Sequence, residues 1–199
     1  IGATSAMLTL VLAIVISLAR AAARRPVERV AVSAPAYAYL AVPAVVLSFG
    51  LFLIVRNAGI APAQMAPSVV VLANALLALP FALATLSPPM EAIVRTKGRL
   101  IRALDLGGFR QFAAVEWPLI APEAGVVLAL AFCFSLGDLG VIALFGTQDF
   151  ATLPLLMYRA LGTYRTNDAA VIAAVLLVLT LAAFVLLPRL FSGSRHADR

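Results

Sequence analysis

Five long apolar runs, separated by polar stretches, constrain the fold of this chain more than any other feature. The runs cover residues 3–19, 36–55, 67–86, 123–145 and 169–187. A helix needs about 20 apolar residues to cross the hydrocarbon core of a bilayer, and each run is close to that length. In the whole chain 63% of residues are hydrophobic and 12% are charged, whereas soluble domains have about 45–50% and about 25%. We therefore predict an all-α membrane protein with about five transmembrane helices.

The basic residues lie in the gaps between the apolar runs, so the net charge of +6 indicates membrane topology and not a nucleic-acid partner. Twelve Lys and Arg residues lie in segments 20–29, 87–122 and 188–199, and three lie in the alternate connections. Positive charge favours the cytoplasmic side of a membrane. We therefore expect these three segments, including the C-terminus, in the cytoplasm, and we expect the N-terminus and segment 146–168 outside.

The outer segment 146–168 is longer than a turn and carries apolar residues at helical spacing. These residues are Leu153, Leu156, Met157, Ala160, Leu161 and Tyr164. The spacing predicts a helix that is half-buried or lies in the membrane interface. A surface loop with a single helical turn is the alternative.

The inner segment 87–122 also exceeds the usual length of a helix connection. It opens with Ser-Pro-Pro-Met-Glu, which is typical of a helix start, and periodic apolar residues continue that helix to Leu104. After Gly107 and Gly108, a second short helix over about 109–116 leads to Pro118. We predict a helix–turn–helix on the cytoplasmic face.

Several chemistries have no support in the sequence. The chain has no Walker-type glycine loop, His196 is its only histidine, and Cys133 is its only cysteine. ATP binding by a P-loop, a Ser–His pair and a metal cluster are therefore unsupported, and we expect a non-catalytic chain without a cofactor or metal. Five helices are few to enclose a transport path, so we expect another half or a second copy. Because the chain begins with Ile1, we expect it to be part of a longer polypeptide.

The inner segment resembles a known signature. Asp105, nine intervening residues, Val115 and Pro118 match the second half of the pattern E-A-A, three residues, G, nine residues, I-x-L-P, found in membrane subunits of ABC-type importers. The first half departs from the pattern. Arg99, Leu100 and Ile101 stand at the E-A-A positions, and Asp105 stands where glycine is usual.

Three further stretches, residues 74–83, 115–118 and 135–170, resemble the permeases of thiamin importers in this family. The resemblance covers nearly the whole chain, but only the C-terminal half of such a permease. It implies the type I ABC importer permease fold, with residues 1–199 as one transmembrane domain in the bacterial inner membrane. It also implies several partners: the other permease half, surrounding lipid, a dimer of ATPase subunits that uses ATP-Mg, and a periplasmic binding protein. The binding protein delivers thiamin or its phosphate esters. An importer for iron or a polyamine, or a secondary transporter without an ATPase, remains an alternative.

In that family a short coupling helix in the signature loop docks in a groove on the ATPase. The resemblance assigns this role to residues 105–114 and their neighbours. The candidate residues are Arg102, Ala103, Leu104, Asp105, Gly107, Gly108, Phe109 and Phe112. Phe109 would be the apolar anchor, and the two glycines would supply backbone geometries that other residues resist. The alternative is a solvated basic loop that serves topology only.

Four polar side chains are candidates for the substrate pathway: Asn74, Ser135, Asp138 and Tyr158. A carboxylate at the centre of a bilayer costs about 2.5–3.5 kcal/mol, so Asp138 has either a structural or gating role, or a contact with the thiazolium cation of thiamin. Asn74 and Ser135 suit hydrogen bonds between helices as well as substrate contacts. Tyr158 faces either the binding protein or the mouth of the pathway. Pro43 and Pro80 are expected to kink their helices.

Overall fold

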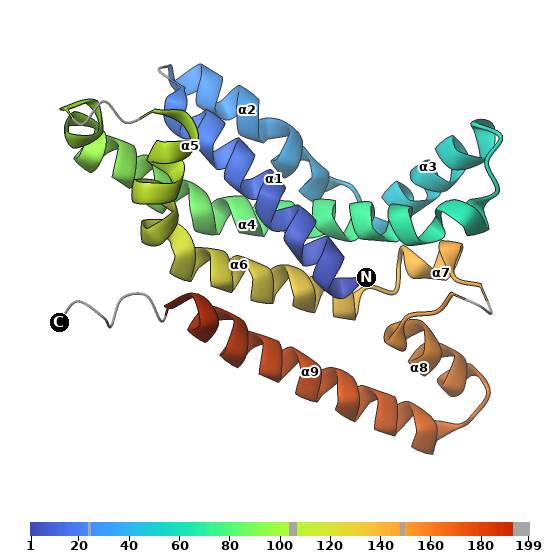
Figure 1. The fold of residues 1–199 in the computed structure, drawn as a ribbon. Helices are drawn as coiled ribbons and strands as arrows, with labels where there is room; N and C mark the ends of the chain where they lie inside the picture. The colour runs from blue at the N-terminus through green and yellow to red at the C-terminus, as the bar shows by residue number, and fades with distance from the viewer. Residues whose placement is uncertain (24, 104–106, 148–149, 193–199) are drawn as a thin grey trace.

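The computed structural model describes residues 1–23, 25–103, 107–147 and 150–192, and these residues form helices and short connections without any strand (Figure 1). Side chains at positions 39, 62, 99, 100, 102, 103 and 192 fall outside this description.

Within the described residues, four helices are long and apolar enough to cross a membrane. They are α1 (Gly2–Ala22), α4 (Pro62–Ala103), α6 (Trp117–Gly137) and α9 (Thr166–Ser192). A helix suits a bilayer because it satisfies its backbone hydrogen bonds within the segment. The prediction of an all-α membrane protein is confirmed, and the first, third and fifth apolar runs lie within α1, α4 and α9.

The second apolar run does not form one helix, which corrects the prediction of a continuous span over 36–55. The chain forms α2 (Pro26–Ala38), a 3₁₀ turn η1 (Tyr39–Ala41) and then α3 (Ala44–Asn57). Pro43 precedes α3 with extended backbone, at φ −57° and ψ 139°. A proline lacks an N–H donor and disfavours helical geometry in the residue before it. The expected kink at Pro43 is therefore a break, and α3, with 14 residues, is shorter than a full span.

Helix α4 is longer than predicted, because it continues without interruption through the Ser-Pro-Pro-Met-Glu stretch to Ala103. The prediction of a new helix start at Ser87 is wrong. Ser87 and Met90 are buried, and the Ser87 hydroxyl lies 3.1 Å from that of Ser17 in α1. Packing against neighbouring helices compensates for the backbone hydrogen bonds that prolines remove inside a membrane helix.

Helix α6 ends earlier than predicted for the fourth run. It stops at Gly137, the backbone becomes extended at Asp138, and α7 (Ile142–Phe145) begins after a short turn. Gly137 and Gly140 flank Asp138, and glycine weakens a helix interior. At its N-terminal end α6 extends backwards into α5 (Gly108–Gln111) and a π-helical turn η2 (Phe112–Glu116).

The predicted helix of the outer segment is confirmed as α8 (Leu153–Gly162). Of its predicted apolar residues, Leu153, Met157 and Ala160 are partly buried, and Leu156 and Leu161 are exposed. Leu155, which does not belong to that set, is buried. Leu155 packs so closely on Gly146 that a side chain at Gly146 would collide with it and with the carbonyl oxygen of Ile142. This contact between the start of α8 and the end of α7 sets the rotation of α8.

Small residues bring the long helices together. The buried alanines are Ala6 and Ala13 of α1, Ala78 and Ala82 of α4, and Ala124 and Ala131 of α6. Small side chains allow backbones to approach in a membrane, where apolarity alone does not drive association. A Cβ added at Gly125 of α6 would lie 2.9 Å from Cα of Pro188, so the backbones of α6 and α9 approach each other closely at this point.

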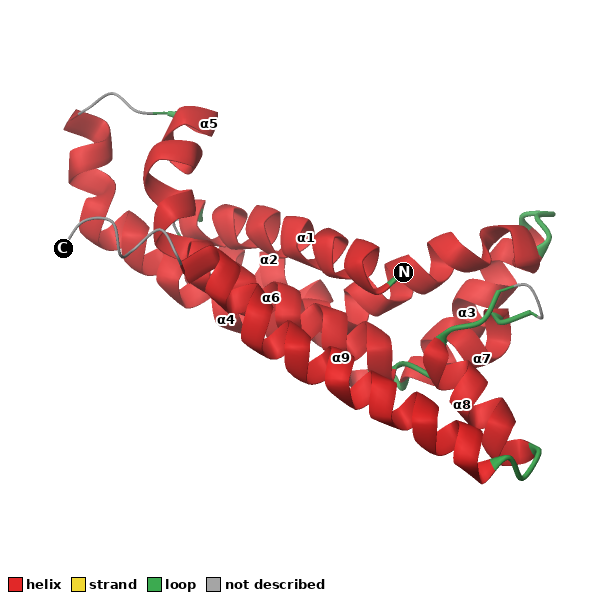
Figure 2. Cartoon of the chain, turned by 60° about the horizontal axis from the view of Figure 1, so that its bottom comes forward, coloured by secondary structure: helices red, strands yellow, loops and turns green. Residues whose placement is uncertain are grey.

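The α1–α2 connection, α5 and the last turn of α9 lie at one end of the molecule, whereas α3, α7 and α8 lie at the other (Figures 1 and 2). We call these the α5 end and the α8 end. Together α2, η1 and α3 carry the chain from the α5 end back to the α8 end. The described ends of the three segments that were grouped by their positive charge therefore lie at the same end.

Candidate functional site: the α5 tip and the polar residues of the helices

The connection between α4 and α6 ends in a helical tip, which we define as residues 107–116. Gly108 has a φ of +58°, in a region that residues with a Cβ rarely adopt. Gly107 has a φ of −142°, which any residue adopts. A Cβ at either position would meet no atom within 4 Å, so glycine is favoured only at Gly108, and for its backbone conformation.

Part of the predicted coupling set cannot be placed. Leu104 and Asp105 lie outside the described residues, and so do the side chains of Arg102 and Ala103. The described members are Gly107, Gly108, Phe109 and Phe112. The unusual aspartate at the glycine position of the signature therefore has no structural account.

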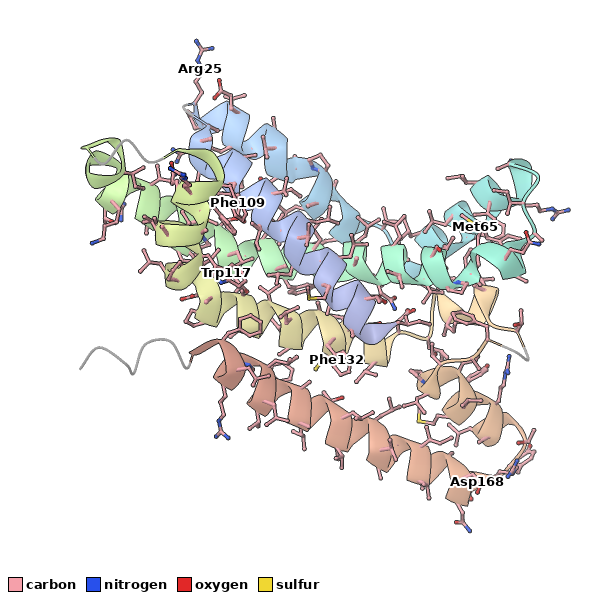
Figure 3. All side chains as sticks on the ribbon, viewed as in Figure 1. Arg25, Met65, Phe109, Trp117, Phe132 and Asp168 are labelled. Carbon is pink, nitrogen blue, oxygen red and sulfur yellow. The ribbon has the colours of Figure 1, made fainter. Side chains whose placement is uncertain are left out.

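Phe109 has the most exposed phenylalanine ring of the described residues, at 81% of its surface (Figure 3). Its ring centroid lies 6.5 Å from that of Phe112, which is half-buried behind it. Beside these two rings a groove of about 630 Å³ lies between the tip and α1 and α4. The tip therefore offers a large apolar side chain next to a depression.

A series of ring contacts connects the tip with α9. The centroid of Phe112 lies 6.0 Å from that of Trp117, and Trp117 contacts Phe191 edge-to-face at 6.2 Å. Such pairs contribute about 0.5–1.5 kcal/mol each beyond the area they bury. The spacing of Phe109, Phe112 and Trp117 is visible in the sequence, but the contact with Phe191 is not.

The predicted short helix over 109–116 is present, but it joins α6 without a break at Pro118. Pro118 directly follows the π-helical turn, inside a helical backbone that is continuous from Gly108 to Gly137, so its missing N–H removes one hydrogen bond from that helix. Gln111 donates a hydrogen bond of 2.6 Å to Oε1 of Glu116, whose side chain is buried. This bond spans the π-helical turn, and such turns are frequent at functional sites.

An ion-pair network at the α5 end was not predicted. Arg20 of α1 approaches Glu91 of α4 at 3.1 Å, and Arg29 of α2 approaches the other carboxylate oxygen at 3.9 Å. The Nε of Arg29 also donates to the carbonyl oxygen of Ala23. One carboxylate thus joins three helices. The sequence shows opposite charges in two inner connections, but no local pattern pairs residues 71 positions apart.

Asn74 and Ser135 form the inter-helix hydrogen bond that was one of the two interpretations of these residues. The Nδ2 of Asn74 donates to Oγ of Ser135 at 2.9 Å, and both side chains are buried. The Oδ1 of Asn74 is buried without a partner among the described residues. The pair connects α4 with α6 near the point at which α6 ends.

Asp138 stabilises the turn that follows α6. Its Oδ1 accepts a hydrogen bond of 3.2 Å from the N–H of Val141, which fixes the entry into α7. This contact supports the structural interpretation of Asp138. Its Oδ2 is buried and has no hydrogen-bond partner among the described residues.

The structure does not bring all four pathway candidates together. Asp138 lines a cavity of about 420 Å³ between α4, α6 and α9, and Ser135 lies one helical turn before it. Tyr158 is exposed on α8 and does not line that cavity. The described residues also contain no group of three His, Cys, Asp or Glu side chains arranged to hold a metal ion.

The sequence of this chain is similar to those of known transport proteins. A thiamine transport system permease protein of Brucella abortus is 35% identical over 197 residues, which is 99% of this chain and 36% of the relative. The corresponding protein of Salmonella typhimurium is 39% identical over 158 residues, 79% of this chain and 29% of the relative. A probable sulfate transport system permease protein of Nephroselmis olivacea is 30% identical over 115 residues, 56% of this chain and 40% of the relative. No family model matches the chain.

The chain thus spans about a third of the length of the thiamine permeases that it matches. Its helices and their apolar lengths agree with a membrane-embedded transport protein. The alignment with the Brucella abortus protein covers 99% of the chain and is not confined to the signature loop. The chain is therefore an all-helical membrane protein similar to thiamine transport permeases.

Proposed function

We propose that this chain is part of the transmembrane permease of a bacterial ATP-driven importer for thiamin and its phosphate esters. The observation that carries the proposal is the 35% identity with a thiamine transport system permease over 197 residues. The chain contributes to the membrane pathway, and a separate ATPase subunit hydrolyses ATP-Mg. A second permease half and a periplasmic binding protein complete the importer.

The tip is the part of the chain that docks on the ATPase. Three observations support this role: the exposed ring of Phe109, the groove beside it, and the ring contacts that lead from the tip to α9. Exposed aromatic side chains that fill a partner's pocket dominate the energy of many interfaces. The series of rings lets a displacement of the tip reach a long helix without passing through a flexible loop.

The α5 end faces the cytoplasm in this proposal, with the C-terminus on the same side. The positively charged segments support this orientation, because Lys and Arg bias connections toward the cytoplasm. Arg20, Arg29 and Arg95 all lie at the α5 end.

Co-purification of the ATPase with the complete permease tests the docking role. We expect Phe109→Asp to reduce the recovered ATPase by at least about tenfold, because a charge at the anchor costs the interface more than about 1.4 kcal/mol. Tyr164→Asp is the matched control, since Tyr164 is 91% exposed at the α8 end. Both variants should insert into membranes normally. Undiminished ATPase recovery with Phe109→Asp would refute the docking role.

ATP hydrolysis by the reconstituted importer tests which substrate it transports. We expect thiamin, presented by its binding protein, to stimulate ATP hydrolysis several-fold, and sulfate to have no effect. Sulfate is the informative competitor because one relative is named a probable sulfate permease. Stimulation by sulfate alone would replace the proposed substrate, whereas an absence of any ATPase partner would favour a secondary transporter.

A further inference from the structure

The cavity beside Asp138 has a single charge in apolar surroundings. Leu77 of α4 and Leu130 of α6 line it together with the rings of Phe134 and Phe184, and Asp138 supplies its one charged side chain. Its volume of about 420 Å³ lies within the range of about 300–1,000 Å³ that is usual for small-molecule sites.

The carboxylate of Asp138 has no counter-charge among the described side chains. Its Oδ1 accepts the N–H of Val141, its Oδ2 is buried without a hydrogen-bond partner in the described part of the chain, and none of the ion pairs between described residues includes it. A buried charge without a partner is costly. A cation in the cavity would lower that cost by its attraction to the carboxylate as a whole.

The aromatic walls favour the same kind of ligand. Phe134 stacks on Phe81 of α4 with the ring centroids 4.8 Å apart, which holds the ring of Phe134 in place. Phe134 and Phe184 nevertheless remain 38% and 43% exposed. The face of an aromatic ring attracts a cation within about 6 Å and also stacks on a flat ring.

We propose that this cavity binds a flat organic cation, with the carboxylate of Asp138 as its counter-charge and the phenylalanine rings against its plane. The proposal rests on the proposed function, because the thiazolium ring of thiamin is such a cation, and it names the place where that ring is held. Sulfate would not bind beside Asp138, because the negatively charged carboxylate would repel it.

Cys133 also lines the cavity and provides a probe that does not depend on transport. The assembled importer in liposomes is treated with a trimethylammonium-ethyl or a neutral hydroxyethyl methanethiosulfonate, and labelling of Cys133 is followed by peptide mass spectrometry. We expect the ratio of the cationic to the neutral rate to fall about tenfold in Asp138→Asn, a change of about 1.4 kcal/mol. The ratio cancels any change in the reactivity of the thiol itself. Asn retains an acceptor for the N–H of Val141, so the turn is preserved.

Protection by ligand identifies the cation. We expect thiamin to slow labelling of Cys133, and its neutral isostere, in which carbon replaces the thiazolium nitrogen, to protect at about tenfold higher concentration. In Asp138→Asn the two compounds should protect equally. Phe134→Leu keeps the charge and removes an aromatic face, so thiamin protection should weaken while the rate ratio stays high.

The results separate the two proposals. A rate ratio that is unchanged in Asp138→Asn, or a Cys133 that neither reagent reaches, overturns the cation site. A ratio that depends on Asp138 without protection by thiamin retains an organic-cation site and removes thiamin as its ligand. Thiamin-stimulated ATP hydrolysis with normal uptake by Asp138→Asn retains the importer and removes the cavity from its pathway.

Discussion

Helices α4 and α9 are both apolar enough to cross a membrane, yet they occupy opposite positions in the fold. The more apolar of the two, α9, has a mean hydropathy of 3.1 in its best window, against 2.3 for α4. Only 6% of that window of α9 is buried, whereas 61% of the window of α4 is buried. The helix with the stronger hydropathy is therefore the peripheral one (Figure 1).

The difference follows from the solvent. In a bilayer an apolar side chain gains little by leaving lipid for protein, so close packing and hydrogen bonds decide which helix is central. Helix α4 has small residues at its contacts and donates from Asn74 to Ser135. Thr9 of α1 also donates to the carbonyl oxygen of Ala75 in α4 at 3.3 Å. Helix α9 presents mainly Val and Leu outward, a surface suited to lipid or to another membrane segment.

The largest effect is expected where the backbone of α9 lies directly against Gly125 of α6. Gly125→Leu places a side chain against the backbone at Pro188, within 2.9 Å of its Cα. Because that backbone cannot rotate away as a side chain can, we expect a loss of about 3 kcal/mol or more in the free energy of unfolding. Unfolding in micelles of increasing dodecyl sulfate content, followed by circular dichroism, measures the loss.

Gly50→Leu in α3 is the matched control, since a Cβ at Gly50 meets no atom within 4 Å. It should leave the unfolding midpoint nearly unchanged. If Gly125→Leu behaved like this control, α9 would not be held where the structure places it.

A second test applies one substitution to both helices. Val70 of α4 is fully buried, and Val178 of α9 is 65% exposed. We expect Val70→Ala to lower the free energy of unfolding by about 1–2 kcal/mol through lost packing, and Val178→Ala to change it by less than about 0.5 kcal/mol. Equal losses in the same unfolding assay would show that α9 is covered by protein in the assembled permease.

The smallest expected effect concerns the hydrogen bond of α4. A double-mutant cycle with Asn74→Ala and Ser135→Ala should give a coupling energy of about 0.6 kcal/mol, since hydrogen bonds between membrane helices rarely exceed about 1.7 kcal/mol. The same unfolding assay on the two single variants and the double variant provides it. A coupling of zero would mean that the two side chains act independently, and would leave packing alone to explain the position of α4.

The errors of the sequence predictions share a cause. The run lengths correctly indicated apolar helices, but the ends of the helices followed local backbone chemistry and packing. Pro43 broke a run that its composition showed as continuous, and the turn at Asp138 ended another. Ser87 did not start a helix, because the prolines after it are accommodated within α4. The apolar spacing in α8 did not include Leu155, whose buried position depends on its contact with Gly146.

For the candidate site, the sequence indicated which residues to examine but not their partners. The spacing of the signature indicated Gly108 and Phe109, and the cost of placing a carboxylate in a bilayer indicated Asp138. The contacts of Phe191, Glu91 and Cys133 depend on segments far apart in the chain, and no local pattern reports them.

The sequence by itself determined that this chain is a helical membrane protein, with its positive charge concentrated in alternate connections and a Gly-Gly pair in one of them. These properties depend on run length, charge and backbone preference, which are local. Only the tertiary structure decided that α4 is central and α9 peripheral, that rings connect the tip with α9, and that Asp138 lines a cavity together with two phenylalanine rings. Such arrangements arise from close packing between distant segments, and hydropathy does not encode them because lipid and protein interior are alike to an apolar side chain.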